Sequence, residues 1–415
     1  MVPEDWETIN LSDVVYYQEG PGLRKWQYRP SGVPFLNIRC IKDGKIVTEA
    51  LQFVDETEAM SKYRHFLLQA GDFVVSSSGT LGRVATVTEA DIPLMLNTSI
   101  IRMRSKEPTR CSMQYLWHYL RSKHFLDQVT RESQGSAQAN FGPSHLDKAM
   151  IILPPLKEQL KIASRLSAID AAIEKTKAVI DQTKRLKQGL LQELLTRGIG
   201  HTKFKQTEIG EIPEGWSVDS LESICSGGKG LQTGPFGSQL HASDYVNAGV
   251  PVVMPRDIKN LNIDGENAAK VSQDLADSLS KHKLQYGDLV FSRRGDIGRC
   301  GIVRKENVGW LCGTGCLRAR ADSQINPFYL LYAVASQRAQ SWLNEHAVGQ
   351  TMLNLNSSIL GDLQIPIPRR QEQDKIVKLL TGIDNHLTSN SFVNLESIKA
   401  AVSRDLLSGD VRCIP

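Results

Sequence analysis

The sequence lacks an apolar run as long as the 18 or more residues of a membrane span, and residues 1–30 lack the apolar core of a secretory signal. It also lacks the residue patterns of several enzyme classes. No Gly-Lys-Ser/Thr, G-x-G-x-x-G, H-E-x-x-H or E-x-K pattern is present to bind a nucleotide or a metal ion or to cut nucleic acid. We therefore expect a cytoplasmic protein that carries out no chemistry of its own.

Cysteine is scarce and odd in number, with seven residues in 415, which argues against a secreted disulfide framework. Cys300, Cys312 and Cys316 are close enough in sequence to suggest a zinc site. The first half of the chain carries apolar residues at the matching positions, namely Val84, Leu96 and Ile100. These cysteines are therefore predicted to be buried strand residues rather than metal ligands.

Charge is nearly balanced, with a net charge of +4 and a pI of about 8.6, which permits binding to nucleic acid without requiring it. The balance is uneven along the chain, because residues 157–205 contain eleven Lys and Arg but five Asp and Glu. This segment is either a solvated helix face or a face turned towards phosphates, and the sequence leaves both readings open.

An internal repeat is the strongest feature of the sequence. "PPLKEQLKIASRLSAID" (154–170) returns as "PRRQEQDKIVKLLTGID" (368–384), with eight of seventeen positions identical. Other segments match in the same order: "PEDWETINLSDV" (3–14) with "PEGWSVDSLESI" (213–224), and "LLQAGDFVVSSSGTLGRVATV" (67–87) with "KLQYGDLVFSRRGDIGRCGIV" (283–303). Each half is thus a globular block of about 150 residues followed by a segment of about 45.

Within each block, the Gly-Asp turns before "FVV" and "LVF" indicate strands, as do "VATV", "SIIRMR" and "CLRAR". Helical spacing of apolar residues covers 113–129 and 327–343. We predict a mixed α/β (α+β) fold for each block. "NPFY" (326–329) resembles the motif with which amino-methyltransferases hold an exocyclic amine, but Asn326 as a helix N-cap followed by Pro327 explains it fully.

The trailing segments carry apolar residues at heptad spacing, which predicts long helices that need a partner helix. The second copy changes phase after residue 387, as a stutter would. We expect the two helices to pair as an antiparallel coiled coil with pseudo-two-fold symmetry; each helix folding back on its own block is the alternative. The predicted seam consists of Ile162, Leu166, Ile169, Ile173, Ile180, Ile376, Leu380, Ile383 and Leu387.

Glycine-rich polar loops are the parts of the repeat that keep their glycines but change their side chains. "EGPGLRKWQY" (19–28) corresponds to "TGPFGSQLHASDY" (233–245), "SSSGTLGR" (76–83) to "SRRGDIGR" (292–299), and "GSAQANF" (135–141) to "GQTMLNL" (349–355). Arg and Lys suit guanine, Asn and Gln suit adenine, and glycine turns allow close approach to phosphates. The loops therefore suggest two different DNA-reading surfaces on one scaffold, although any single residue is equally well read as an ordinary exposed loop residue.

The candidate DNA-binding residues are those polar, basic or aromatic loop residues. In the first half they are Arg24, Lys25, Trp26, Gln27, Ser77, Ser78, Thr80, Arg83, Gln138 and Asn140. In the second half they are Gln232, Thr233, Phe236, Ser238, Gln239, His241, Arg293, Arg294, Arg299 and Asn354. No catalytic residue and no metal ligand is predicted.

Taken together, the "P-E-x-W" openings, the "G-x-x-G-R" loops, the repeated helix start and the linker "HTKFKQTEIGEIPEGW" (201–216) resemble the specificity subunit of a type I restriction-modification system. The resemblance implies two target-recognition domains that read a bipartite, asymmetric double-stranded DNA site, and long helices that space them and dock two methyltransferase subunits. It implies no cofactor on this chain, with S-adenosylmethionine, ATP and Mg²⁺ on the methyltransferase and motor/nuclease subunits. The implied divisions are 1–153 and 213–367 for the two domains, 154–200 and 368–411 for the helices, and 201–212 for the linker.

Other hypotheses remain at this point. A specificity subunit of a fused, type IIB-like restriction-methylation enzyme shares the two-headed plan. A pure protein-interaction scaffold, whose basic helix is simply solvated, and a self-contained modification or nuclease enzyme are alternatives from other classes, and the missing motifs argue against the enzyme.

Overall fold

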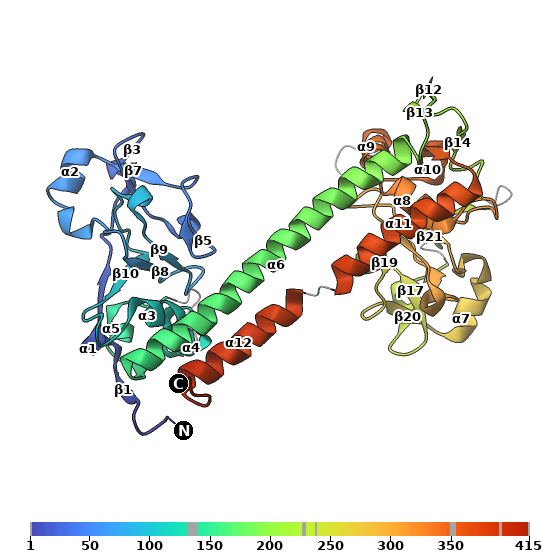
Figure 1. Ribbon diagram of the computed structural model, residues 1–415. Coiled ribbons are helices and arrows are strands. Elements are labelled where there is room, and N and C mark those ends of the chain that lie inside the picture. Colours follow the sequence, from blue (N-terminus) through green and yellow to red (C-terminus); the bar gives the residue numbers. More distant parts are fainter. Residues whose placement is uncertain are drawn as a thin grey trace. The chain divides into compact units, whose positions relative to one another are not determined.

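The computed structural model of the protein describes residues 2–131, 140–225, 230–236, 239–348, 354–389 and 392–413 (Figure 1). The chain forms two compact units. Unit 1 consists of Met1–Ala178 and Ser391–Pro415, and unit 2 of Val179–Asn390. The last segment of the sequence therefore belongs to the same unit as the first. In the described part of the chain, no helix has both the length and the apolarity needed to cross a membrane.

Unit 1 is built on an antiparallel sheet with the strand order β2-β10-β8-β9. Its strands are β2 (Val15–Glu19), β10 (Ile100–Ser105), β8 (Phe73–Ser76) and β9 (Val84–Thr86). All of β8 is buried, because alternate residues enter different cores: Phe73 and Val75 belong to one apolar cluster and Val74 to another. Both faces of this sheet are covered, as expected of strands that read as continuous apolar runs.

Two short helices cover the face that carries Phe73 and Val75. They are α3 (Met113–Leu120) and α4 (Lys123–Thr130). The sequence predicts helical spacing over 113–129, but Ser122 interrupts it, since its side chain accepts a hydrogen bond from the Phe125 backbone N–H and so begins a new helix. Smaller elements complete unit 1: β1 (Glu7–Asn10) paired with β11 (Met150–Leu153), α1 (Leu11–Val14), α5 (Pro143–Leu146), α2 (Glu56–Met60), β3 (Tyr28–Arg29), β4 (Val33–Phe35), β7 (Gln52–Val54), β5 (Ile41–Lys42) and β6 (Lys45–Ile46).

Unit 2 repeats this plan with a sheet of order β15-β24-β21-β22-β19-β18. Its strands are β15 (Leu231–Thr233), β24 (Cys316–Ala319), β21 (Leu289–Ser292), β22 (Cys300–Ile302), β19 (Leu261–Ile263) and β18 (Ile258–Lys259). Leu289 and Phe291 enter one cluster while Val290 enters another, as in β8. Cys300, Cys312 and Cys316 are buried and unbridged on β22, β23 (Leu311–Cys312) and β24, which confirms the prediction of buried strand cysteines.

The short helices of the unit 2 block are α7 (Gln273–Ser278), α8 (Pro327–Val334), α9 (Gln337–His346) and α10 (Ser357–Asp362). Asn326 is the N-cap of α8, accepting hydrogen bonds from the backbone N–H groups of Phe328 and Tyr329, which confirms the structural reading of "NPFY". The remaining strands are β14 (Ser217–Ser220) paired with β25 (Gln364–Ile367), and β16 (Tyr245–Val246), β20 (Ala269–Val271) and β17 (Val250–Val253) beside β23. The mixed α/β class predicted for both halves is confirmed.

The first trailing segment forms one helix, α6 (Leu156–Thr196), which begins in unit 1 and ends in unit 2. The second forms two helices, α11 (Arg370–Ser389) in unit 2 and α12 (Phe392–Ser408) in unit 1, rather than the single helix expected over 368–411. α11 ends at Ser389 and α12 begins at Phe392, close to the point where the heptad phase of the sequence shifts. The linker predicted over 201–212 contains β12 (Phe204–Thr207), which pairs with β13 (Gly210–Pro213) as a hairpin.

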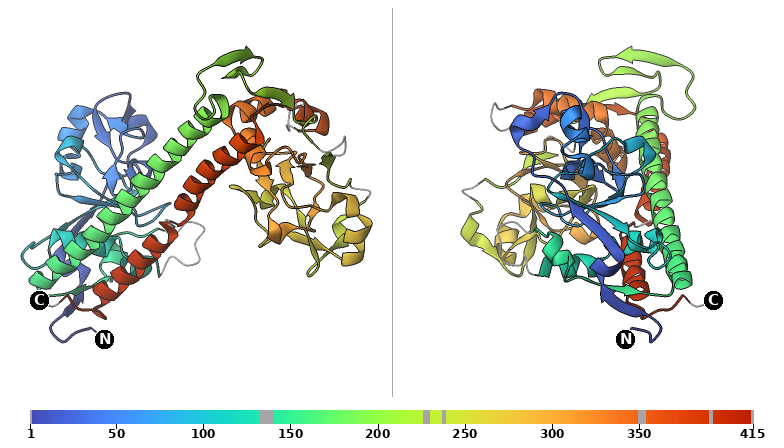
Figure 2. Two further views of the ribbon diagram at one scale, coloured as in Figure 1. Left: turned by 45° about the vertical axis from the view of Figure 1, so that its right-hand side comes forward. Right: turned by 90° about the vertical axis from the view of Figure 1, so that its left-hand side faces the viewer.

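Each end of α6 has a helix beside it within the same unit (Figures 1 and 2). In unit 1, Ile162 and Leu166 of α6 share an apolar cluster with Leu406 and Leu407 of α12. In unit 2, the equivalent cluster joins the C-terminal end of α6 to α11 through Leu194, Leu195, Ile376 and Leu380. Ion pairs from Asp170 to Lys399 and from Lys177 to Glu396 show that α6 and α12 are antiparallel. The same apolar stripe thus contributes both to helix pairing and to the globular core.

The other predicted seam residues are less uniformly covered. Ile173 is buried, whereas Ile169, Ile180 and Ile383 are half-buried. The side chain of Leu387 lies outside the described residues. Regular coiled-coil packing of the long helices, with knobs of one in holes of the other, stays a prediction.

The glutamate that both repeats retain is a hydrogen-bonding hub in unit 1. Glu158 accepts a bond from the indole Nε1 of Trp6 at 3.1 Å and from the backbone N–H of Cys413 at 2.9 Å. Arg412 donates to both carboxylate oxygens, at 3.0 and 2.8 Å. Burial alone would raise the pKa of Glu158, but these donors lower it below the ordinary value. The start of α6 therefore fixes the segment that follows α12 and the first turn of the chain.

Unit 2 has the same hub with other donors. Glu372 accepts a bond from the Nε1 of Trp216 at 3.1 Å, the backbone N–H of Ile199 at 3.0 Å and the Nε2 of His201 at 2.8 Å. Here the start of α11 fixes the segment that follows α6. In both units the Trp of the "P-E-x-W" opening donates to the Glu of the helix start. This bond explains why both copies of the repeat carry the two motifs.

The glutamine next to this glutamate has equally specific partners in both units. Gln159 and Gln373 are buried, and their side-chain oxygens accept bonds from the backbone N–H groups of Ser112 and Asn326, just before α3 and α8. Each also donates to the carbonyl of the proline five positions earlier. The repeated helix start is therefore a polar joint that fastens a long helix to its globular block.

Candidate nucleic-acid interface

In unit 1, three loops gather at one edge of the sheet, where β2 and β8 end and β10 begins. The backbone N–H of Ser77 bonds to the carbonyl of Ser99 at 2.9 Å, and the carbonyl of Ser77 accepts the N–H of Phe141 at 2.9 Å. Ser78 and Asn140 form an isolated bridge. The sequence-distant segments 76–83, 97–99 and 140–142 are therefore held together by backbone hydrogen bonds.

The loop 76–83 is a turn closed by hydrogen bonds of its own residues. The hydroxyl of Ser76 donates to the carbonyl of Thr80 at 2.6 Å and accepts the N–H of Arg83 at 2.9 Å. Gly79 and Gly82 have φ of 66° and 72°, a conformation that glycine adopts without strain. This frame presents Thr80 and Arg83 to solvent and is independent of which side chains stand between the glycines.

Unit 2 reproduces the cluster. The backbone N–H of Arg293 bonds to the carbonyl of Gly315 at 2.9 Å, and its carbonyl accepts the N–H of Leu355 at 2.9 Å. The hydroxyl of Ser292 again donates into the loop, to the carbonyl of Arg294 at 2.8 Å. Arg294 bridges to Asn354 as Ser78 does to Asn140. Two loops with matching backbone hydrogen bonds thus carry Ser-Ser in one unit and Arg-Arg in the other.

Most predicted site residues of unit 1 lie at or near the surface. Arg24, Lys25, Trp26, Thr80, Arg83 and Asn140 are exposed, and Ser78 is half-buried. Ser77 is buried. Gln27 is also buried, and its amide donates to Glu58 at 2.8 Å and to the hydroxyl of Tyr63 at 3.0 Å, so it supports the loop from below. Gln138 lies outside the described residues.

In unit 2, Phe236, His241 and Arg294 are exposed. The other described candidates are half-buried: Gln232, Thr233, Gln239, Arg293, Arg299 and Asn354. Arg299 is paired with Asp296 at 2.8 Å, as part of its own loop. Ser238 lies outside the described residues.

Sequence reasoning missed the third loop of each cluster. Asn97-Thr98-Ser99 and Gly313-Thr314-Gly315 occupy equivalent places, because their last residues receive the N–H groups of Ser77 and Arg293. Thr98 is exposed and hydrogen-bonds to the Glu19 side chain, whose pKa is raised by burial. The signal that could have found this loop is the threonine common to both copies.

The buried cysteine thiols of unit 2 are unreactive. Burial raises the pKa of Cys300 and Cys312 to about 12, so both thiols stay protonated near neutral pH. No group of three or more His, Cys, Asp or Glu side chains that could hold a metal ion occurs among the residues that the structure places.

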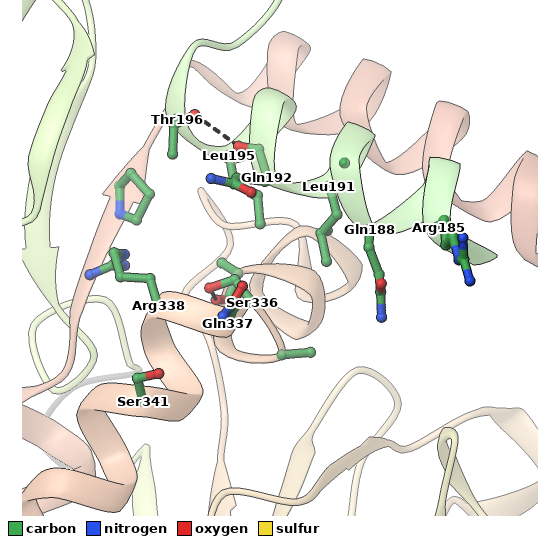
Figure 3. Close-up of a pocket in the computed structure, with 14 residues that line it drawn as sticks. Arg185, Gln188, Leu191, Gln192, Leu195, Thr196, Ser336, Gln337, Arg338 and Ser341 are labelled. Carbon is green, nitrogen blue, oxygen red and sulfur yellow. Dashed lines mark hydrogen bonds between the residues drawn. The ribbon is translucent and has the colours of Figure 1, made fainter. Parts of the chain in front are cut away.

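Each unit also has a groove where a long helix passes the turn between two short helices. In unit 2 the groove holds about 1030 Å³ and lies between α6 and the α8–α9 turn. Figure 3 shows Leu191 directed from α6 towards the helix that carries Ser336 and Gln337. In unit 1 a groove of about 760 Å³ lies between α12 and the α3–α4 turn, with Ser122 and Lys123 at the corresponding places.

Comparison with known proteins agrees with this architecture. The family model for the "Type I restriction modification DNA specificity domain" matches residues 3–185 and 213–399. A type I restriction enzyme MjaVIII specificity subunit from Methanocaldococcus jannaschii is 25% identical, with 99% of this chain and 94% of the relative covered. The EcoBI specificity subunit from Escherichia coli is 23% identical, with 91% and 79% covered.

Solved structures show the same fold. A chain from a study of complex assembly and conformational transition of the type I R-M system has a TM-score of 0.62 at 19% identity, covering 99% of this chain and 100% of that one. The type I restriction-modification S subunit from M. genitalium has a TM-score of 0.54 at 15% identity, covering 97% and 96%. With its two matched specificity domains, this chain belongs to the family of type I restriction-modification specificity subunits.

Proposed function

We propose that the chain reads an asymmetric, bipartite site in double-stranded DNA, one half-site with each loop cluster. The observation that carries the proposal is the pair of equivalent loop frames with unlike side chains at the accessible position, Ser78 in unit 1 and Arg294 in unit 2. Hydroxyl groups pair with several bases, whereas Arg prefers guanine. Unlike side chains on like frames predict unlike half-sites, separated by an unread gap so that their centres lie about one helical turn apart.

The chain's role in the complex is recognition, and the reactions belong to its partners. We infer that two methyltransferase subunits dock on it, one at each of the equivalent grooves, through a helix that completes the packing of α6 in unit 2 and of α12 in unit 1. Repetition of the groove favours two copies of one partner. S-adenosylmethionine is then bound by the methyltransferase subunits, and ATP and Mg²⁺ by the motor/nuclease subunits. An adenine must leave the base stack to be methylated, which is a task for the methyltransferase.

The decisive experiment compares genome-wide adenine methylation in cells with and without this chain, and then measures binding of its purified complex with the methyltransferase to the site so found. We expect one bipartite motif to lose methylation, and binding to that motif ~10³-fold or more tighter than to a scrambled duplex. Binding with no preference for any bipartite sequence would contradict the proposal.

A single substitution assigns one unit to one half-site. Arg294→Ala should relax selection at one position of the unit 2 half-site, with a loss of ~1–3 kcal/mol of discrimination. Arg197→Ala is the matched control, since Arg197 is an exposed arginine of unit 2 at the end of α6, beside Phe204. A uniform loss of affinity for all sequences in Arg294→Ala, with Arg197→Ala unchanged, would show that Arg294 contacts phosphate only.

A further inference from the structure

Trp26 stands out on the surface of unit 1. Its side chain is 73% exposed, and no other large hydrophobic side chain in the described part of the chain exceeds 65%. The other tryptophans are buried or half-buried. An indole of this size left in water is unusual, because aromatic side chains ordinarily supply much of the apolar area buried on folding.

The segment that carries Trp26 is firmly built. It is a single turn of 3-10 helix, Lys25–Gln27, closed by a bond from the Arg24 backbone N–H to the Gln27 side chain at 3.0 Å. Gln27 is anchored in turn to Glu58 and Tyr63. Arg29 donates to the carbonyl of Trp26 at 2.9 Å. The indole is therefore held outward by the fold, and little backbone entropy is lost when it meets a ligand.

The surroundings of Trp26 are cationic. Arg24, Lys25 and Arg29 are exposed, and the stretch 24–29 contains no acid. Among the residues that the structure describes, no salt bridge engages these three cations. An aromatic side chain among cations is an arrangement that binds stacked bases within a phosphate backbone, with the ring against a base and the cations along the strand.

We propose that Trp26 stacks on a base of the half-site read by unit 1, with Arg24, Lys25 and Arg29 against the flanking phosphates. The inference rests on the proposed function, which it deepens by naming a contact and its mode. Stacking requires an opened base step, so the affinity supplied by Trp26 tolerates different bases and depends on an aromatic ring.

Unit 2 does not repeat this device. Its equivalent 3-10 turn, Ala242–Asp244, is closed by Asp244 to the His241 backbone N–H and carries Ser243 in place of Trp26. The exposed aromatic residue of this loop, Phe236, lies before the turn. The stacking contact is thus a property of unit 1 at this position.

The test measures binding of the full chain, in complex with its methyltransferase partner, to a duplex carrying the bipartite site identified by methylation mapping. Trp26→Ala should weaken binding ~10-fold, Trp26→Phe should stay close to wild type, and Trp26→Leu should behave like Ala. Tyr286→Ala is the matched control, because Tyr286 is 55% exposed on the turn before β21 of unit 2 and should leave affinity unchanged. Stacking also quenches indole emission, so wild type should lose fluorescence on DNA binding and Trp26→Phe should lose less.

The remaining outcomes are distinguishable. Full affinity in Trp26→Leu would replace stacking by simple apolar contact and overturn the inference. So would unchanged affinity in Trp26→Ala, or release of the methyltransferase by that variant, which would place Trp26 in a protein interface. If the wild-type complex showed no preference for the bipartite site, the proposed function itself would fail.

Discussion

Units 1 and 2 keep the same acceptors and differ in their donors. Glu158 is held by a guanidinium, Arg412, while Glu372 is held by an imidazole, His201, and each also receives a tryptophan indole and a backbone N–H. The repeat therefore conserves the carboxylate at the start of the helix and lets the donor change. The acceptor position is the structural requirement, because it is the point where three separate segments meet.

A second difference lies one helix away. His118 of unit 1 corresponds to Tyr332 of unit 2. The Nε2 of His118 hydrogen-bonds to Ser167 at 3.0 Å, and its ring faces Asp170, whereas the hydroxyl of Tyr332 donates to Asp384 at 2.8 Å. Burial lowers the pKa of His118 to about 4 and raises that of Tyr332 to about 12. Unit 1 therefore has a group here that responds to mild acid, and unit 2 has none at the same position.

The largest expected effect comes from breaking the hubs. Glu158→Ala leaves Trp6 and Arg412 without their acceptor and should lower the free energy of unfolding by ~3 kcal/mol. Glu372→Ala should cost less, since it removes the acceptor of an imidazole rather than of a guanidinium that donates two hydrogen bonds to the carboxylate. Thermal or urea unfolding of the full chain measures both, with Glu158→Gln as an isosteric control that retains part of the bonding. Equal losses from the two Ala variants would show that donor charge does not matter.

Acid should distinguish the units next. Because the folded-state pKa of His118 lies below its ordinary value of 6.5, only the unfolded chain takes up that proton between pH 6.5 and about 4, and stability falls through this window as the pH falls. The loss should reach ~2 kcal/mol by pH 5. Asp170 opposes the shift, while Arg121 and Lys399 add to it.

Unfolding of wild type and of His118→Tyr at pH 7 and pH 5 measures this effect. Tyrosine is chosen because unit 2 has Tyr332 at the equivalent position. The variant should lose the part of the acid sensitivity above pH 4.5 that His118 contributes, while His124 and His282, whose pKa burial also lowers, leave a remainder in both proteins. Below about 4.5, protonation of Glu158 adds a second loss in both proteins, since its folded pKa is lowered. Identical pH dependence of the two proteins above pH 4.5 would exclude His118 as the source.

The smallest effect should come from the ion pairs along the helices. Lys399→Ala removes the pair with Asp170 in unit 1, and Lys187→Ala the pair with Asp384 in unit 2. Each should cost ~0.5 kcal/mol, and the cost should shrink in high salt, as for partly exposed pairs generally. Double-mutant cycles with Asp170→Asn and Asp384→Asn would isolate the pair energies. A salt-independent loss would indicate lost packing of the lysine stems instead.

Much of the architecture could be predicted from the sequence because it is written in local patterns. Gly-Asp turns before apolar runs predicted β8 and β21. The apolar residues at the matching positions of the first half predicted that the cysteines of the second half are buried. Spacing alone placed the helices, but the N-cap Ser122 and its equivalent Ser336 divide each predicted helix in two. A hydroxyl that begins a new helix competes with continued periodicity, and only the observed cap settles which one wins.

The candidate site was predicted as a set of loops, and its internal order was not. Gln27 looks like a base-reading amide in sequence but is buried against Glu58, 31 positions away. Thr98 and Thr314 were overlooked because a single threonine shared by the two copies is a weak signal, although backbone bonds from Ser77 and Arg293 bring their loops into the clusters. Side-chain exposure in a loop depends on contacts that sequence spacing does not encode.

The sequence by itself determined that the chain is a duplicated α/β protein with paired helix starts and unlike loops, because repeats, apolar periodicity and turn residues are local properties. Only the tertiary structure decided that Glu158 accepts hydrogen bonds from Arg412, 254 residues later, and that the C-terminal helix belongs to the first unit. A buried carboxylate must find donors wherever the fold brings them, and that requirement acts through space rather than along the chain.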